Sequence, residues 1–335
     1  MLANPYGPAR RAGFGRAAWK RVFATLGERS KTMTTATQSD IFALLGPAVR
    51  ALATRYDAAM QAANEQAGIA PADLNLLLLA RGAEPEAPTR SLLQRQMPYL
   101  GGAGLAELLA GAAERGLLAE EPSGSYWLTE RGRASLENTF GAVHAALAGY
   151  QPLPEARLGR AADLLQRVVE AMLATPEPAG KFHLLSSRLT DPGAGASAAA
   201  RLDQYATDLL HFRDDAHQAA WQPLTADGPA WEILTLIWRG EANTLAALQQ
   251  RLERRRHDPA VIEQALADLR ERGWIVPSGE AFEPSLAGRE RREQAEETTD
   301  RLFYTPWNVL STTEIDELHE LLGQLRDSAP QAEGS

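Results

Sequence analysis

Apolar residues recur at steps of three and four along most of the chain, which is the spacing of one face of an amphipathic helix. The first such series follows Asp40, a candidate helix cap, and consists of Ile41, Leu45, Val49, Leu52, Tyr56 and Met60. Similar series predict helices over residues 71–80, 89–98, 105–116, 199–220, 231–238, 244–252, 259–270 and 286–303, with a last one after 311. The pattern is typical of a mainly α protein.

Two short segments break the helical spacing and predict β-hairpins. In the first, Leu117–Glu121 and Ser125–Thr129 flank the turn candidate Pro122-Ser123-Gly124. In the second, Trp274–Val276 and Phe282 flank Pro277-Ser278-Gly279. Each hairpin follows one helix and precedes another, which is the order found in winged-helix domains.

Three short motifs occur twice, in the same order and at nearly one period. The pairs are Glu114-Arg115-Gly116-Leu117-Leu118 with Glu271-Arg272-Gly273-Trp274-Ile275, Pro122-Ser123-Gly124 with Pro277-Ser278-Gly279, and Gly132-Arg133 with Gly288-Arg289. Each pair marks a helix end, a hairpin turn or the start of the next helix. We interpret this as two diverged winged-helix units in tandem. The alternative is two unrelated helical segments that share common turn chemistry.

The segment boundaries follow from this repeat and from turn-rich stretches. We expect a basic head over 1–38, a first winged-helix domain over 39–175, a linker over 176–198, a second domain over 199–327 and a loose tail over 328–335. The head admits three interpretations: a targeting peptide, a nucleic-acid-binding arm, or upstream sequence translated from a misplaced start, since Met33 precedes the first helix.

The charge of the chain is unevenly distributed. Residues 1–33 hold seven basic residues and one acid, a net charge of +6, whereas the whole chain carries −9. The remainder therefore carries −15. Because an acidic body is repelled by phosphate, DNA binding by this chain would need a local basic patch.

Residues 105–133 resemble the recognition helix and wing of MarR-type regulators. The resemblance rests on the pattern Leu-x-x-Leu-Leu-x-x-x-x-Glu-Arg-Gly-Leu-Leu from Leu105 and on Leu128-Thr129-Glu130-Arg131-Gly132-Arg133, and it covers residues 40–173 and 181–327. It implies two tandem winged-helix domains that form an internal pseudo-dimer within a monomeric chain. It also implies a transcription regulator that binds double-stranded DNA and responds to a small-molecule effector.

Candidate DNA contacts lie beside the two expected recognition helices. These residues are Arg90, Gln94, Arg95, Arg251, Arg254, Arg255, Arg256 and Gln264. Arginine and glutamine are the side chains that bind phosphates and base edges. The family usually has an arginine at the tip of the wing, and neither turn here has one. The alternative function is therefore a sensor or interaction scaffold, derived from such a regulator, that does not bind DNA.

The segment from Tyr205 to Trp221 has the densest polar chemistry of the chain. On a helix, Asp208, His211 and Asp215 would share one face at metal-ligand spacing. We instead assign His211, Arg213 and His217 to binding an acidic effector, and we expect no enzyme activity, catalytic residue, metal or cofactor.

Two absences in the sequence bear on the class of protein. The chain has no cysteine, which excludes disulfides and thiolate chemistry. No apolar stretch reaches the roughly 20 residues that cross a bilayer, so we expect a cytoplasmic protein without a membrane partner.

Overall fold

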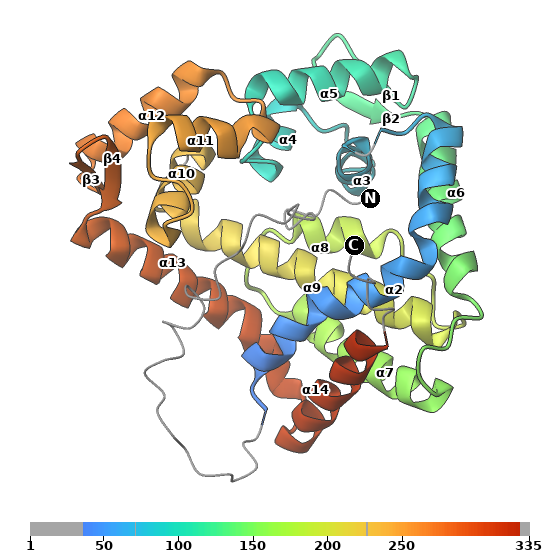
Figure 1. The fold of residues 1–335 in the computed structure, drawn as a ribbon. Coiled ribbons are helices and arrows are strands. Elements are labelled where there is room, and N and C mark those ends of the chain that lie inside the picture. The colour runs from blue at the N-terminus through green and yellow to red at the C-terminus, as the bar shows by residue number, and fades with distance from the viewer. Residues whose placement is uncertain (1–35, 71, 226, 329–335) are drawn as a thin grey trace, which may run out of the picture.

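The computed structural model describes residues 36–70, 72–225 and 227–328, and the protein is mainly helical (Figure 1). Residues 1–35 of the predicted head 1–38 and residues 329–335 of the predicted tail 328–335 lie outside the described residues, and Gln38, at the end of the predicted head, already belongs to the first helix. The first series of elements is α2 (Gln38–Ala67), α3 (Asp73–Gly82), α4 (Arg90–Gln96), α5 (Gly102–Glu114), β1 (Leu118–Glu120), β2 (Tyr126–Leu128), α6 (Glu130–Leu147) and α7 (Glu155–Ala174).

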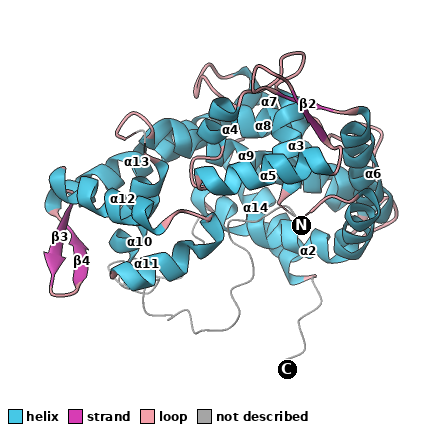
Figure 2. Ribbon diagram, turned by 90° about the horizontal axis from the view of Figure 1, so that it is seen from above, coloured by secondary structure: helices cyan, strands magenta, loops and turns pink. Residues whose placement is uncertain are grey.

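The second series has the same order after a short additional helix, α8 (Phe182–Arg188). It consists of α9 (Ala198–Trp221), α10 (Gly228–Arg239), α11 (Leu245–Leu252), the 3-10 turn η1 (Glu253–Arg255), α12 (Pro259–Glu271), β3 (Ile275–Ser278), β4 (Ala281–Pro284), α13 (Leu286–Tyr304), η2 (Thr305–Val309) and α14 (Thr312–Asp327). We refer to α2–α7 as the first unit and to α9–α14 as the second unit. Their hairpins lie at opposite ends of the molecule in both views (Figure 2).

The junction between hairpin and following helix is built in the same way in both units. In the first unit, the Thr129 hydroxyl accepts from the Gly132 amide at 2.9 Å and donates to the Gly116 carbonyl at 2.7 Å. In the second unit, Ser285 makes the equivalent bonds to the Gly288 amide at 3.0 Å and the Gly273 carbonyl at 2.5 Å. A hydroxyl at this position caps the helix and fixes the returning strand.

Gly116 and Gly273 close the helices that precede the two hairpins. Their φ angles are 69° and 68°, in the left-handed region that glycine adopts without strain. The Glu-Arg-Gly motif therefore marks the same helix end in both units, as its sequence predicts.

Buried apolar residues form three cores. One lies under α3, α5 and the first hairpin, and another lies under α10, α12 and the second hairpin. The third core is central and draws on both units, because it contains side chains of α2, α7, α9 and α14 together with the end of α13. Each unit thus has a small core of its own and shares a larger one.

The last helix of each unit packs against the first helix of the other. Helix α7 contacts α9, and α14 contacts α2, while α2 and α9 also contact each other (Figure 1). This reciprocal exchange means that neither unit completes the central core alone.

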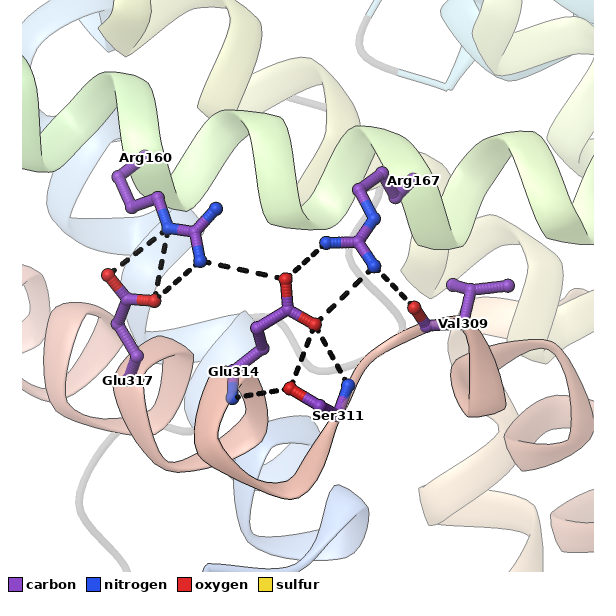
Figure 3. Close-up of polar contacts among 6 residues, drawn as sticks. All are labelled: Arg160, Arg167, Val309, Ser311, Glu314 and Glu317. Atoms are coloured by element: carbon purple, nitrogen blue, oxygen red, sulfur yellow. Dashed lines mark hydrogen bonds and ion pairs between the residues drawn. The ribbon is translucent and has the colours of Figure 1, made fainter.

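Helices α7 and α14 also meet through a charged seam (Figure 3). Arg160 donates to both carboxylate oxygens of Glu317 at 2.8–3.1 Å, and Arg157 pairs with Glu320 at 2.7 Å. Arg167 pairs with Glu314, and its hydrogen bond, together with that of the Ser311 amide, lowers the pKa of Glu314 to about 2. All the arginines come from α7 and all the glutamates from α14.

Three local features differ from the sequence predictions. The first is the cap of α2, which is Thr37 rather than Asp40, since Asp40 lies in the first turn and completes a capping box with Thr37. Helix α8 lies within the predicted linker 176–198, because tertiary contacts rather than apolar spacing stabilise it. Pro277 and Ser278 belong to strand β3, so the second hairpin turns at Gly279 and Glu280, with Ser278 opposite Ala281. The first hairpin has the longer loop, which includes the predicted Pro122-Ser123-Gly124 turn.

The close approach at the hairpin junctions gives a stability prediction. A Cβ on Gly132 would lie 2.3 Å from the Leu117 carbonyl oxygen, and one on Gly288 would lie 2.0 Å from that of Trp274. We expect Gly132→Ala and Gly288→Ala each to lower the free energy of unfolding by about 1–3 kcal/mol in urea titrations, because the backbone must move.

Gly141, on the same helix as Gly132, is the matched control. A Cβ on Gly141 would have no neighbouring atom within 4 Å. Gly141→Ala should therefore raise the free energy of unfolding by up to about 1 kcal/mol, because alanine has the higher helix propensity. Equal effects of the Gly132 and Gly141 substitutions would contradict this account of the junction.

Candidate nucleic-acid interface

Helices α4 and α5 of the first unit, and α11 and α12 of the second, have the order of a helix-turn-helix. Thr89 caps α4 and Thr244 caps α11, each by accepting from a backbone amide three residues later. Each cap also pairs with the hairpin of its unit, Thr89 with Ser125 and Thr244 with Ala281. Hairpin and helix-turn-helix are therefore held as one body in each unit.

In the first unit, Arg90 and Gln94 converge on the start of α5. The Arg90 guanidinium donates to the Gly102 carbonyl at 2.8 Å, and the Gln94 amide donates to that of Leu100 at 2.7 Å. Arg90 is nonetheless exposed, as is Arg95 on the same short helix. This end of α5 thus has two arginines that can reach an anion.

In the second unit, the predicted residues have different surroundings. Arg251 is exposed and pairs with Glu241 at 3.1 Å. Gln264 donates to Asp268 on the surface of α12. Arg254 is exposed and, within the part of the chain that the structure describes, has no acidic partner. Arg254 is therefore the cation of this group with the fewest competing contacts.

Arg255 and Arg256 face the first unit. Arg255 donates to Glu232 at 2.8 and 3.0 Å, and its guanidinium carbon lies 5.5 Å from the ring centre of Tyr99. Arg256 has a left-handed φ of 54° and pairs with Glu107 of α5 at 2.5 Å. The sequence predicts that both arginines bind DNA. In the structure they lie at a contact between the two helix-turn-helix turns, which are residues 98–101 before α5 and residues 254–257 before α12.

That contact joins the turn before α5 to the turn before α12. The Gly101 amide donates to the Arg255 carbonyl at 2.7 Å. A Cβ on Gly101 would lie 2.3 Å from the Arg256 carbonyl oxygen. A Cβ on Gly228, at the start of α10, would lie 2.1 Å from the carbonyl oxygen of Pro98. Only glycine allows backbones to approach this closely.

Residues 126–334 match the model of a helix-turn-helix family, which is more than half of the chain. The chain belongs to this helix-turn-helix family. Membership indicates a DNA-binding regulator in general terms. Comparisons with curated proteins and with solved structures give no match.

Tyr99 is a functional candidate that the sequence reasoning missed. Its ring lies 5.7 Å from that of Trp221, which stacks at 5.9 Å on Trp231. A tyrosine between Pro98 and the glycines of the helix-turn-helix turn is the signal in the sequence, since a turn at the surface rarely needs an aromatic ring.

Arg292 of α13, also missed, lies beneath this aromatic group and is fully buried. Its guanidinium carbon is 4.5 Å from the ring centre of Trp231 and 5.1 Å from that of Trp238, and it pairs with Glu296. Burial lowers the pKa of Arg292. The two rings offset part of the cost of burying this charge.

The three predicted effector residues separate onto two sides of α9. On one side, the His211 ring stacks at 6.3 Å on that of His183 in α8. On the other side, Arg213 pairs with Asp300 at 3.0 Å and lies 4.5 Å from the Phe42 ring, and the His217 ring is 3.4 Å from the Thr299 hydroxyl. No single site therefore contains all three side chains.

Asp208, His211 and Asp215 do share one face of α9, and that face holds α8. Asp215 accepts from the amides of His183 and Leu184 at 3.0 and 2.9 Å and so caps α8, although burial raises its pKa to about 7. Asp208 accepts from Ser187 and Arg188. Among the described residues, no group of three or more His, Asp or Glu side chains could hold a metal ion.

Within the described ranges, none of the helices has the length and apolar character needed to span a bilayer.

The buried histidines give a pH prediction. Burial, with His183 as a neighbour, lowers the pKa of His211 to about 3, against about 6.5 in an unfolded chain. The unfolded chain then binds more protons below pH 6.5, so this histidine lowers stability as the pH falls. Asp203 and Asp215, with pKa values raised to about 7, act in the opposite direction over the same range.

The comparison of wild type with His211→Gln isolates the histidine from the carboxylates. As the pH falls from about 7.5 to about 5, we expect the free energy of unfolding of wild type to fall by up to about 2 kcal/mol more than that of the variant. Gln66→Ala, at the exposed end of α2, changes no titratable group, so it is the control and should follow wild type. If His211→Gln also follows wild type in urea titrations, His211 is not held neutral by the fold.

Proposed function

We propose that this protein is a transcription regulator of MarR-like type in which one chain supplies two winged-helix units in tandem. The observation that carries the proposal is the repeated order of helix, helix-turn-helix, hairpin and terminal helix, with matched caps and glycines at matched positions. Family membership indicates DNA as the ligand. The reciprocal exchange of α7 and α14 supports an internal pseudo-dimer.

The charged seam supports a monomeric chain. Because α7 contributes arginines and α14 contributes glutamates, α7 of one chain facing α7 of another would place arginine against arginine. Like charges at such short range oppose association, whereas the pairing within one chain is complementary. The two units thus diverged toward pairing with each other.

The proposed DNA surface includes Arg90, Arg95, Arg251 and Arg254, which are exposed beside the two helix-turn-helix turns. Arg255 and Arg256 contribute to the contact between units instead. An effector response is part of the proposal, and its candidate place is the contact of α8 with α9. There, the Nδ1 atom of His211 is buried without a hydrogen-bond partner among the described residues.

A second candidate function is a sensor or scaffold that does not bind DNA. Acidic side chains on the two expected recognition helices favour it, namely Glu107 and Glu114 on α5 and Glu263 and Asp268 on α12. The contact between the two turns favours it too, because that contact covers part of α5. The two functions differ in one measurable property, the affinity for duplex DNA.

The test is binding of the full chain to duplex DNA at about 50 mM salt, followed by a salt titration. We expect binding that weakens steeply with salt and saturates at one chain per site. Replacing Arg90, Arg251 and Arg254 together by alanine should lower the affinity roughly tenfold or more and reduce the salt slope by about 0.9 for each phosphate that the variant no longer neutralises.

Arg326→Ala, on the exposed end of α14, is the control and should bind as wild type does. Arg255→Ala should destabilise the fold instead, since Arg255 pairs with Glu232. The absence of any binding at low salt, with the protein folded, would overturn the DNA-binding function and favour the scaffold.

A further inference from the structure

The two helix-turn-helix turns differ in chemistry although they hold matched positions. In the first unit the turn is Pro98-Tyr99-Leu100-Gly101, which is uncharged and contains an aromatic ring. In the second unit the turn is Arg254-Arg255-Arg256-His257, which is cationic. An aromatic turn and a cationic turn complement each other, and the contacts between them show that they pair.

Tyr99 is the centre of this pairing. Its ring is half-buried against the core of the second unit, between the Trp221 ring and the Arg255 guanidinium. Next to Tyr99, the Gly101 amide donates to the Arg255 carbonyl at 2.7 Å. Two further bonds cross the contact, from Gln218 to the Gln96 carbonyl at 3.3 Å and from Gln222 to the Arg95 carbonyl at 3.4 Å.

The contact also limits the distance between the two expected recognition helices. A Cβ on Gly104 of α5 would lie 3.0 Å from the Arg256 Cβ, and α12 begins at Pro259. The starts of α5 and α12 are therefore at most about 20 Å apart, given about 3.8 Å per residue. Paired recognition helices that enter successive major grooves need roughly 34 Å between half-sites.

We propose that Tyr99 is a latch: seated between Trp221 and Arg255, it holds the two helix-turn-helix turns together in a closed form, and its release lets the two units separate and bind DNA more tightly. This inference rests on the proposed DNA-binding function. Opening leaves the central core intact, because the side chains of α2, α7, α9 and α14 that form this core do not include Tyr99 or any other residue of the two turns. It also frees Arg256, which the closed form ties to Glu107 of α5, and uncovers Arg255, which keeps its partner Glu232 within the second unit.

The opening itself is tested by a distance measurement that needs no DNA. The chain has no cysteine, so Ser123→Cys and Glu280→Cys place two spin labels at the exposed tips of the two hairpins. We expect one narrow distance in the wild-type background and a second, longer population in Tyr99→Ala. Tyr99→Phe, which keeps the ring, and Tyr150→Ala, on the loop after α6, should both keep the wild-type distance.

DNA affinity is measured on the same variants, and we expect Tyr99→Ala to bind about tenfold more tightly than wild type. A reversible test uses Gly104→Cys with Arg256→Cys, whose Cβ atoms would lie 3.0 Å apart. A shift of roughly 0.5 Å brings them to the separation of about 3.5–4.5 Å that a disulfide needs. The oxidised form, locked closed, should bind at least about tenfold more weakly than the reduced form.

Three results would overturn the proposal. The first is a folded Tyr99→Ala protein with the wild-type distance. The second is a separated protein that binds DNA no more tightly than wild type. The third is an oxidised cross-link that binds as tightly as its reduced form, and this test decides the matter if Tyr99→Ala fails to fold, because it keeps Tyr99. Separation of the hairpins without DNA binding by any variant would instead overturn the DNA-binding function.

Discussion

The reciprocal packing of terminal helices is the constraint on which the rest of this structure depends. Helix α7 completes the core beside α9, and α14 completes it beside α2. About 25 cal/mol is gained for each Å² of apolar surface removed from water, so a shared core of this kind dominates the stability of both units. Its geometry fixes where α3–α5 and α10–α12 emerge, and hence where the two helix-turn-helix turns can meet.

A fixed centre with two smaller lobes suits regulation. Each lobe has its own apolar core and a hairpin junction locked by a hydroxyl cap, so it moves as one body. Among the described residues, the lobes meet through one aromatic ring, a few hydrogen bonds and the exposed ion pair of Arg256 with Glu107, which contribute little each. Such a contact can break while the central core remains folded. A small change in the population of the closed form would then change the access of DNA to α5 and α12.

The sequence predicts the parts of this fold whose causes are local. The Glu-Arg-Gly helix ends and the two hairpins depend on neighbouring residues, so their motifs suffice. Helix α8 was missed because Asp215, far along the chain, caps it. The role of Arg255 was missed for a similar reason, since periodicity cannot show which surface a turn residue faces. The complementary chemistry of the two turns, by contrast, is visible in the sequence. When the two halves are aligned by their repeat, Tyr99 falls opposite the arginine cluster of the second half.

The central claim, that both units fold as one body through their exchanged helices, is tested most directly by hydrogen exchange of the full chain under native conditions. If the claim is right, amides of α7 and α14 exchange with the same free energy of opening as those of α2 and α9, and all four lose protection together as urea is added. If α7 and α14 exchange much faster while α2 and α9 stay protected, the terminal helices are appendages and the shared core does not hold the units together.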